Sequence, residues 1–446
     1  MKTIFITSFH PLISRNILRT GLLDILAGRD MKVVILAPQI KKEYFLKEFS
    51  GKNISVEGVD MVLSKRDFFF RQIALAITPT SDLYIKKRTK LYEDKKRFSF
   101  AAAMLPAFLF GRSKMALFVL RFFDYVFGDR KSIRDLFMKY KPDIIFSTDI
   151  QNEIDIRILQ FAKKEKIKTA GMVRSWDNLT SKGVIRFCPD ILITHNEVVK
   201  KEAVYYSRID PGRIKVIGIP HYDKYLLGHA ESRESFFKKF GFDINKKLIL
   251  FAPIGDRYIK NNTTDQYVLD ALSELDTNIL VRIPPTDGVS FGGFESKKAK
   301  VAFDDAGTSS WKGGKKLNEI GASDDKSLIS SLCHSNAVVT GQSTITIDAA
   351  VFGKPAVIIH FESPKHPYWE SITKYYDYEY YAKFNEYCGL RFAESPADLV
   401  GLVNAYLENP EKDRDIRERI LKNQVRFMDG RSTERLANIL AKELSI

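Results

Sequence analysis

The sequence has 446 residues, of which 45% are hydrophobic and 28% charged, and its formal net charge is +15. This length predicts two domains of about 200 residues each, and the hydrophobic content is that of a soluble protein. The longest apolar run, Phe100 to Phe110, is about half as long as a membrane-spanning helix must be, so we expect no transmembrane segment.

The cysteines and the start of the chain indicate the compartment. Cys188, Cys333 and Cys388 lie far apart and show neither disulfide nor zinc spacing, which favours a reducing compartment. The chain passes from Met1 directly into an apolar strand, without a signal-peptide pattern. We therefore expect a cytoplasmic protein.

The first half of the chain alternates short apolar strands with helices. A strand at 2–8 precedes a helix at about 14–27, with Ser14 as N-cap and Gly28 at its end. Further strands are predicted at 32–38, 141–147, 169–173, 190–194 and 213–219, and helices at 152–165 and 196–206. This alternation predicts right-handed β-α-β crossovers and a parallel sheet.

Residues 64–141 interrupt this alternation with a basic and aromatic segment. They hold 18 Lys and Arg against 7 Asp and Glu, and phenylalanines stand among the cations at 68–70, 98, 100, 108, 110, 118, 122, 123 and 127. Cations beside apolar side chains suit the surface of an anionic membrane, from which a lipid-linked acceptor would reach the first domain. The alternative is an ordinary pair of core helices with solvated lysines.

The alternating pattern restarts in the second half of the chain. The polar stretch 228–234 is interpreted as a hinge, and a helix at 232–240 leads into the second domain. Strands are predicted at 247–252, 278–283, 299–303, 337–340 and 356–359. A charged helical segment closes the chain from about residue 397.

The most informative segment is Val338 to His360, VVTGQSTITIDAAVFGKPAVIIH. It predicts a strand, a sharp turn at Gly341, a helix capped by Ser343 or Thr344, and a second parallel strand. A helix N-terminus with free N–H groups and two hydroxyls suits a diphosphate. One turn further on, Asp348 is placed to accept hydrogen bonds from a ribose. The alternative is an ordinary β-α-β unit with a well-capped helix.

These residues resemble the C-terminal domain of GT-B glycosyltransferases, where a Ser-Thr turn, a Glu-Ala helix and Gly-Lys-Pro hold the nucleotide diphosphate of a donor sugar. The matching residues are Ser343-Thr344, Asp348-Ala349 and Gly353-Lys354-Pro355. CDP-glycerol-type glycerophosphotransferases share this architecture and often carry Asp, as here, in place of Glu. Segments 216–223 and 427–435 resemble the Gly-x-Pro-x-x-Asp exit and the Asp-Gly-x-x-x-x-Arg tail of the same families.

The resemblance implies an α/β fold with two Rossmann-like parallel-sheet domains facing across a cleft. Residues 1–228 would bind the acceptor, and residues 229–396 the nucleotide donor. Residues 397–446 would form terminal helices that pack back on the first domain.

Candidate residues of the acceptor domain follow its strands, because ligands of open parallel sheets bind beyond the strands' carboxyl ends. His10 is a candidate general base on an acceptor hydroxyl, and Arg15 could bind a phosphate or carboxylate. Trp176 could stack on a sugar ring, Asp177 is a second candidate base, and Asn178 could grip hydroxyls. The alternatives are a packed loop histidine and a well-knit turn.

Two loops of the donor domain carry further candidates. Gly255 would permit close approach of the backbone to a phosphate that Arg257 neutralises. Arg282 opens an Arg-x-x-Pro turn like that of GT-B enzymes and is either a second diphosphate contact or a salt-bridged structural residue. Several families, including the glycerophosphotransferases, have His before the final Pro of this turn, where the chain has Pro284.

Other kinds of site lack support in the sequence. Asp413-Arg-Asp415 is a D-x-D, but it lies in a polar late helix instead of after a strand, and Cys and His show no ligand spacing, so we expect no metal. The dinucleotide fingerprint is missing after the first strand, which argues against a dehydrogenase. No RNA motif or Walker loop is present, so we expect no nucleic-acid partner.

These expectations combine into one predicted function. The chain is predicted to be a metal-independent GT-B glycosyltransferase without a cofactor, acting on a cell-surface glycan or lipid-linked acceptor at the cytoplasmic membrane face. Gly341, Gln342, Ser343 and Thr344 would surround the diphosphate of a nucleotide-sugar, with Asp348 on the ribose. Three alternatives stay open: a CDP-glycerol-type glycerophosphotransferase, a UDP-GlcNAc 2-epimerase-like enzyme and a non-catalytic binding protein.

Overall fold

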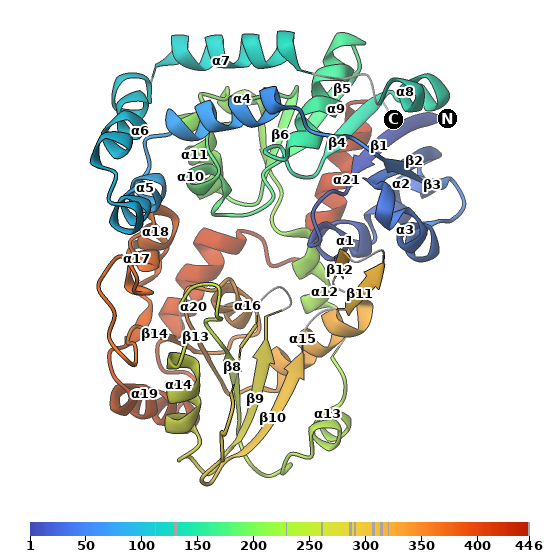
Figure 1. Ribbon diagram of the computed structural model, residues 1–446. Coiled ribbons are helices and arrows are strands. Elements are labelled where there is room, and N and C mark those ends of the chain that lie inside the picture. Colours follow the sequence, from blue (N-terminus) through green and yellow to red (C-terminus); the bar gives the residue numbers. More distant parts are fainter. Residues whose placement is uncertain are drawn as a thin grey trace. The chain divides into compact units, whose positions relative to one another are not determined.

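The computed structural model divides the chain into two compact units, each with its own parallel sheet (Figure 1). Unit 1 comprises residues 1–223 and 429–446, and unit 2 comprises residues 224–428. The structure describes all residues except 112, 129–132, 229, 260–261, 285–287, 290, 306–307, 313–314, 320 and 445–446, and it does not describe the side chains of 99, 308–312 and 315–318.

Unit 1 is built on a seven-stranded sheet in the order β3-β2-β1-β4-β5-β6-β7, and all its strand pairs are parallel. The strands are β1 (Lys2–Thr7), β2 (Met31–Pro38), β3 (Ile54–Val59), β4 (Ile144–Ser147), β5 (Lys168–Met172), β6 (Ile191–Thr194) and β7 (Ile214–Val216). Their helical connections confirm the predicted β-α-β alternation in this half of the chain.

Helices cover both faces of this sheet because alternate strand residues enter two different cores. Ile4 and Ile6 of β1 pack in one core with α2 (Leu22–Gly28), α3 (Lys42–Phe49) and α21 (Ser432–Lys442). Phe5 points to the other core, with α8 (Arg134–Tyr140), α9 (Glu153–Lys164), α10 (Asn178–Ser181) and α11 (Glu197–Ser207). Short elements complete the unit: α1 (Ile13–Asn16), η1 (Leu18–Thr20), η2 (Gln39–Lys41), η4 (Pro211–Arg213) and η5 (Pro220–Tyr222).

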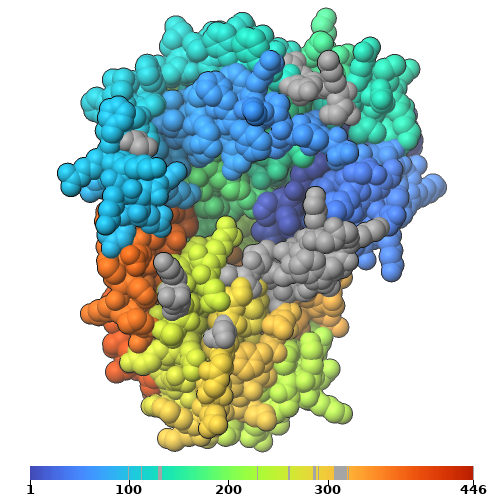
Figure 2. All heavy atoms as spheres, viewed as in Figure 1, coloured from blue at the N-terminus to red at the C-terminus, as the bar shows by residue number. Residues whose placement is uncertain are grey.

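The basic and aromatic segment forms helices between β3 and β4. They are α4 (Lys65–Ala76), α5 (Ser81–Asp94), α6 (Arg97–Phe110) and α7 (Lys114–Phe127), followed by α8. In Figure 2 the atoms of this segment, coloured blue to cyan, form a continuous stretch of surface on unit 1. Within the described residues no single helix passes as a membrane span; residues Phe100–Phe110 and α7 do so only as a pair, bent by 109°.

Unit 2 holds a six-stranded parallel sheet in the order β10-β9-β8-β13-β14-β15 and a separate antiparallel ribbon, β11-β12. The strands are β8 (Leu248–Ala252), β9 (Asn278–Ile283), β10 (Lys300–Asp305), β11 (Thr308–Lys312), β12 (Lys315–Glu319), β13 (Ala337–Thr340), β14 (Ala356–Ile359) and β15 (Arg391–Ala393). The two parallel sheets with flanking helices confirm the predicted α/β class with two Rossmann-like parts.

The helices of unit 2 surround its sheet. They are α13 (Arg233–Phe240), α14 (Thr264–Leu272), α15 (Ala322–His334), α16 (Ile345–Val351), α17 (Thr373–Tyr376), α18 (Glu379–Cys388), α19 (Pro396–Glu408), α20 (Arg414–Ile420) and the π-helix η6 (Leu421–Val425), with α12 (Asp223–Leu226) at the boundary of the units. Asn152, Asn196 and Ser232, the first residues of three predicted helices, are N-caps that accept backbone N–H groups at the starts of α9, α11 and α13.

Several predicted boundaries differ from the structure. The helix predicted at 14–27 is broken at Gly21, whose φ of +88° is left-handed, and Ser14 lies inside α1 instead of capping it. The units meet at residue 223 instead of 228. Of the terminal helices only α21 joins unit 1, because α19 packs on β14 and β15 and α20 packs on α16 and α18.

Two of the recognised motifs meet in unit 1. The carboxylate of Asp223, which ends the Gly-x-Pro-x-x-Asp segment, accepts hydrogen bonds from the backbone N–H groups of Ser432 (3.0 Å) and Thr433 (2.7 Å). These groups open α21, so the Asp223 side chain caps the tail helix. The exit segment and the tail therefore stabilise one another.

Candidate functional sites

In unit 2 the predicted donor residues lie at the carboxyl edge of the sheet, where the strand order reverses. The chain runs from β8 to β9 and β10 on one side and to β13, β14 and β15 on the other. Such a switch point is the usual ligand position of an open parallel sheet. The loops after β8 and β13 touch there, since a Cβ at position 341 would lie 2.8 Å from Cγ1 of Ile254. Gly341 is required by this packing instead of by a positive φ.

The turn after β13 leads into α16 as predicted, but the capping is looser. Thr344 occupies the N-cap without a side-chain hydrogen bond, whereas Oγ of Ser343 accepts the N–H of Ile345 at 3.3 Å. Among the described residues, the N–H groups of Gln342 and Thr344 have no protein acceptor. Oε1 of Gln342 is likewise buried without a partner there. This turn therefore offers unsatisfied polar groups in a short stretch.

Asp348 lies inside unit 2 with a protein partner. It is buried, and its Oδ1 accepts a hydrogen bond of 3.1 Å from the hydroxyl of Tyr225. A carboxylate has acceptor sites for more than one donor, so this bond leaves the ribose contact as a prediction. The tyrosine was not singled out from the sequence, because its partner lies 123 residues away.

The loop after β8 is held by a buried carboxylate that sequence reasoning missed. Asp265 at the start of α14 accepts the N–H groups of Ile254 (2.8 Å) and Gly255 (2.9 Å), and also the amide of Asn262 (2.6 Å). Burial raises the pKa of Asp265 against these hydrogen bonds. Gly255 has a φ of +95°, which favours glycine, but its N–H already serves Asp265. Arg257 in this loop is exposed.

Arg282 has the environment of a structural arginine. Its guanidinium is buried at the end of β9, where it pairs with Asp304 on β10 and donates to the carboxylate of Asp324 at 2.7 Å. Two carboxylates therefore neutralise this cation within unit 2. A diphosphate contact would have to compete with them, and it stays a prediction.

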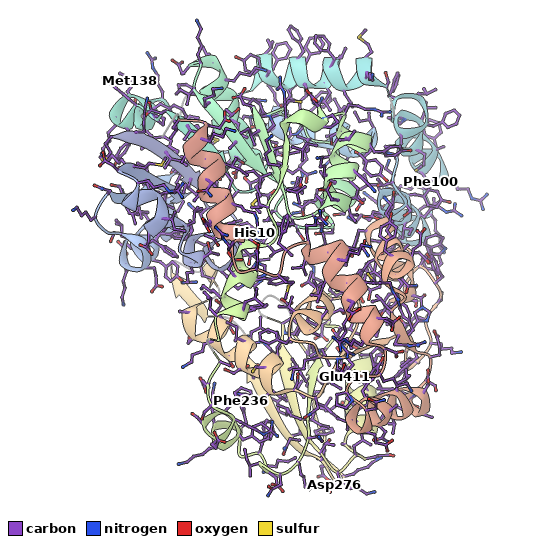
Figure 3. All side chains as sticks on the ribbon, turned by 180° about the vertical axis from the view of Figure 1, so that it is seen from behind. His10, Phe100, Met138, Phe236, Asp276 and Glu411 are labelled. Carbon is purple, nitrogen blue, oxygen red and sulfur yellow. The ribbon has the colours of Figure 1, made fainter. Side chains whose placement is uncertain are left out.

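In unit 1 the strand order reverses between β1 and β4, and the predicted acceptor residues lie at that edge. The loops after these strands are tied together, because Oγ1 of Thr148 donates to the carbonyl of Thr7 at 2.8 Å. His10 follows β1 (Figure 3), Asp149 follows β4 and Arg174 follows β5. The edge therefore gathers the imidazole of His10, the carboxylate of Asp149 and the guanidinium of Arg174.

His10 is held as a neutral imidazole. Burial and, to a smaller extent, the neighbouring charge of Arg174 lower its pKa to about 4, against the opposing charge of Asp149. Its Nδ1 accepts the N–H of Leu12 at 3.2 Å, so the proton of the neutral ring is on Nε2. In this arrangement Nε2 donates a hydrogen bond, and His10 can act as a base only through Nδ1 after releasing Leu12.

Two carboxylates near the carboxyl ends of β1 and β4 were not singled out from the sequence. Asp149 is buried and accepts Nε of Arg174 at 2.8 Å. Burial raises the pKa of Asp155 to about 7; hydrogen bonds from Thr7 and Ser147 oppose this and the charge of Asp149 adds to it. A carboxyl that titrates near neutrality at a sheet's switch point is typical of functional sites.

The remaining acceptor candidates lie in the turn after β5 and in α1. Trp176 is half-buried against the core, and Oδ2 of Asp177 accepts a 3.3 Å hydrogen bond from Ser181. Asn178 is fully buried, and its amide has no partner among the described residues. Nε of Arg15 donates to its neighbour Asn16. The structure thus brings Trp176 and Asp177 to the edge that carries His10, while Asn178 lies beneath it.

No metal site can be assigned in the described part of the chain. There, no three or more His, Cys, Asp or Glu side chains are grouped so as to hold an ion. Metal independence remains an expectation from the sequence.

Comparison with known proteins defines the family. The family model described as CDP-Glycerol:Poly(glycerophosphate) glycerophosphotransferase matches residues 188–442, more than half of the chain and all of unit 2. The chain belongs to this family. No curated protein matches the sequence. Membership confirms the resemblance to GT-B transferases that the sequence motifs indicated.

Several solved structures are similar to this chain over almost its whole length. A Listeria monocytogenes protein assigned as a UDP-N-acetylglucosamine 2-epimerase matches with a TM-score of 0.57 at 13% identity, covering 100% of this chain and 97% of that one. The Neisseria meningitidis 2-epimerase bound to UDP-GlcNAc gives 0.52 at 11%, covering 99% and 100%. A glycosyltransferase of Rickettsia africae gives 0.51 at 12%, covering 99% and 98%. These similarities establish the GT-B fold.

Proposed function

We propose that the chain is a GT-B transferase that moves a glycerol phosphate or similar alcohol phosphate from a CDP-activated donor to a hydroxyl of a cell-surface polymer or lipid-linked acceptor. The observation that carries this proposal is the family match over residues 188–442. The sequence favoured a sugar donor, but the match spans all of unit 2 and bears directly on the donor. It moves our preference from attack at carbon to attack at phosphorus.

The proposed step is one displacement at phosphorus. The acceptor oxygen forms a bond to the β-phosphorus of the CDP-alcohol, and the bond from that phosphorus to the oxygen bridging to the α-phosphorus breaks. CMP leaves with the bonding electrons, and the acceptor proton passes to a base. Hydrogen-bond donors that point at the charge developing on the leaving phosphate would lower the activation barrier.

Unit 2 supplies groups suited to the donor. The N–H groups of Gln342 and Thr344 have no protein acceptor in the described chain, and the hydroxyls of Ser343 and Thr344 flank them. These groups would receive phosphate oxygens without first breaking a protein hydrogen bond. Asp348 would accept a ribose hydroxyl alongside the Tyr225 bond.

Unit 1 supplies the acceptor side of the reaction. Nε2 of neutral His10 carries a proton, so it could donate a hydrogen bond to an oxygen of the acceptor substrate or of a phosphate. Of the two predicted bases, we therefore prefer Asp177. Arg174 is paired with Asp149, so we assign it an electrostatic effect on the neighbouring groups instead of direct binding of a substrate phosphate. Trp176 offers an apolar face to the acceptor.

A sugar transferase is the second candidate, favoured by one observation. Pro284 stands where we expect His before the final Pro in the glycerophosphotransferases, so this turn departs from their pattern. In that case an acceptor oxygen would attack the anomeric carbon, and a nucleoside diphosphate would leave. The two reactions differ in the nucleotide released.

We further propose that the enzyme works at the cytoplasmic face of the membrane. Helices α4 to α7 expose many large apolar side chains, of which Phe98 and Phe108 are 88% and 87% exposed. Cations of the same helices lie among them. Sedimentation with anionic vesicles, compared with neutral ones, tests this placement; binding to neither would contradict it.

A ligand panel tests the donor assignment. Thermal shifts with CDP, UDP and GDP should show the largest stabilisation by CDP, and the effect should be lost in Asp348→Ala. Stabilisation by UDP alone would favour the sugar donor, and acceptor-free turnover of UDP-GlcNAc would indicate an epimerase. No response to any nucleotide would leave a binding protein of another kind and overturn the proposal.

A further inference from the structure

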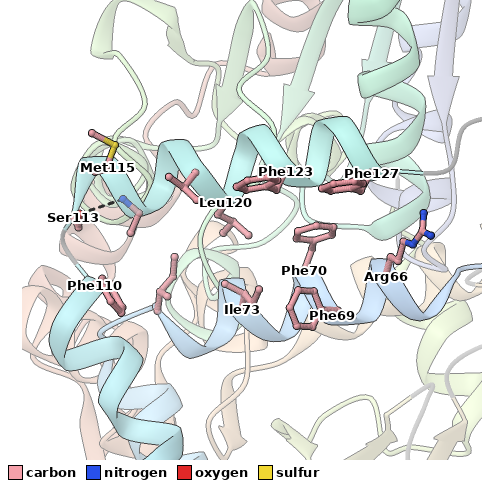
Figure 4. Close-up of a pocket in the computed structure, with 13 residues that line it drawn as sticks. Arg66, Phe69, Phe70, Ile73, Phe110, Ser113, Met115, Leu120, Phe123 and Phe127 are labelled. Atoms are coloured by element: carbon pink, nitrogen blue, oxygen red, sulfur yellow. Dashed lines mark hydrogen bonds between the residues drawn. The ribbon is translucent and has the colours of Figure 1, made fainter.

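An apolar hollow lies between α4 and α7 (Figure 4). It has a volume of about 690 Å³, within the range of small-molecule sites. Apolar side chains line it from both helices and from the end of α6, among them Phe69, Ile73, Val119 and Phe123. Among the described residues that line the groove, Arg66 is the one charged residue and Ser113 the one other polar residue.

The two helices run antiparallel, so the polar groups mark opposite ends of this groove. Figure 4 shows Arg66 beside Phe127 at one end, and Ser113 with Phe110 at the other. A 14-residue helix such as α7 is about 21 Å long at 1.5 Å per residue. The groove is therefore elongated, apolar along its length and cationic at one end.

A buried charge cluster fixes both walls of the groove. The guanidinium of Arg157 on α9 pairs with Asp67 of α4 and, at 2.8 Å, with Asp124 of α7. Arg186 adds pairs to Asp124 (3.4 Å) and Glu153. Because these side chains are nearly inaccessible to solvent, the spacing of α4 and α7 is set from beneath. The hollow is a formed feature of unit 1 instead of a packing gap that the helices could close.

The cation at the end of the groove is available to a ligand. Arg66 is exposed and has no ion pair or hydrogen bond among the described residues. Its neighbour Asp67 does not neutralise it, because that carboxylate faces inward to Arg157 and Ser64. An arginine at the end of an apolar groove is suited to bind a phosphate whose attached hydrocarbon chain lies along the groove.

We propose that this groove binds the single hydrocarbon chain of a lipid phosphate, with the phosphate on Arg66, and so anchors the lipid-linked acceptor of the reaction. The inference rests on the proposed function for the identity of the acceptor, but the binding itself does not. A flat membrane contact would use every exposed phenylalanine of α7 alike, whereas the groove selects Phe123 and Phe127 over Phe118 and Phe122. That selection makes the proposal testable.

Two matched pairs of variants separate the groove from the general surface. Phe123 lines the groove and is 43% exposed; Phe122, next to it, is 52% exposed and does not line it. Arg66 lines the groove, and its exposed neighbour Lys65 does not. Phe123→Asp and Phe122→Asp, and Arg66→Gln and Lys65→Gln, therefore make the same chemical change at adjacent positions. Val119→Asp provides a second groove variant.

The experiment measures binding of dodecyl phosphate and of dodecanol to the full chain by calorimetry, without donor or turnover. We expect one dodecyl phosphate per chain. Phe123→Asp and Val119→Asp should weaken it by about tenfold or more, because a charge would enter an apolar site. Arg66→Gln should weaken dodecyl phosphate but not dodecanol, and Phe122→Asp and Lys65→Gln should change neither.

Three results would overturn the proposal. The first is no binding of dodecyl phosphate to the unaltered protein. The second is an equal loss in Phe122→Asp and Phe123→Asp, which would indicate an undirected surface. The third is a dimer that Phe123→Asp dissociates while no lipid binds, which would make the groove an interface between copies. A failed CDP assay with intact dodecyl phosphate binding would instead count against the proposed function alone.

Discussion

Arg157 on α9 contacts Asp124 on α7 at 2.8 Å, and both side chains are almost completely excluded from solvent. Asp67 of α4 accepts a bond from the same guanidinium, so one arginine links two buried carboxylates, and Arg186 adds a second cation to Asp124 at 3.4 Å. We predict that Arg157→Met lowers the free energy of unfolding by about 3–5 kcal/mol, because the Asp67 carboxylate loses its ion pair and Asp124 is left with the longer pair to Arg186. Urea denaturation measures this. Arg414→Met, which breaks exposed pairs only, should change it by less than about 1 kcal/mol; equal effects would contradict the prediction.

The close approach of Gly341 to Ile254 predicts a steric effect at the donor loops. Gly341→Ala places a methyl group 2.8 Å from Cγ1 of Ile254, so the two loops must separate. We expect weaker CDP binding and a lower melting temperature, with partial recovery in the Gly341→Ala, Ile254→Ala double variant. Gly401→Ala, in α19 and without a close neighbour, is the control: it should leave CDP binding unchanged and should not lower the melting temperature, because Ala favours a helix more than Gly.

Asp155 predicts a pH dependence of stability. Its folded pKa of about 7 lies above the usual value of 3.8, so the folded state holds a proton that the unfolded state has lost. This contribution is fully present below about pH 4 and is lost as the pH rises through 7. Asp155→Asn should therefore raise stability relative to the native chain more at pH 8 than at pH 5, by about 2–3 kcal/mol.

The control for this measurement has the opposite sign. Hydrogen bonds from Thr3 and Lys2 hold the pKa of Asp143 below its usual range despite partial burial. Its contribution is present above the unfolded pKa and is lost as the pH falls. Asp143→Asn should thus cost stability at pH 8. A parallel response of the two variants in urea unfolding at both pH values would contradict the assignment of Asp155.

Tyr225 and Asp348 predict separable roles at the donor site. If Asp348 also binds the ribose, Asp348→Asn weakens CDP binding, whereas Tyr225→Phe removes the hydroxyl that donates to Asp348 and leaves CDP affinity nearly unchanged. Calorimetric titration of both variants with CDP measures this. An equal loss in both would show that the carboxylate serves the structure of unit 2 and not the nucleotide.

Much of the fold could be predicted from the sequence, because buried parallel strands are short runs of Ile, Val, Leu and Phe between turn residues. β3 and β15 were not predicted, because neither of them is an uninterrupted apolar run. Glu57 and Gly58 interrupt β3, although Lys139, Lys42 and Tyr140 hold the Glu57 carboxylate and its pKa falls to about 2. β15 is three residues long and begins with Arg391.

The candidate sites were less predictable, because their partners are distant in sequence or belong to the backbone. Asp265 acts on the N–H groups of residues 254 and 255, which leave no trace in side-chain spacing. The tautomer of His10 depends on the N–H of Leu12. Arg282 was left between two roles, and only the placement of Asp304 and Asp324 shows its pairing.

The most direct test of the proposed reaction is the identity of the nucleotide released. The full chain is incubated with CDP-glycerol and a lipid-linked or polymer acceptor, and ³¹P NMR follows the products. We predict CMP and a new phosphodiester in equal amounts, in the unaltered protein and not in Asp348→Ala. Release of UDP from a UDP-sugar with the same acceptor, and no CMP from CDP-glycerol, would contradict transfer at phosphorus.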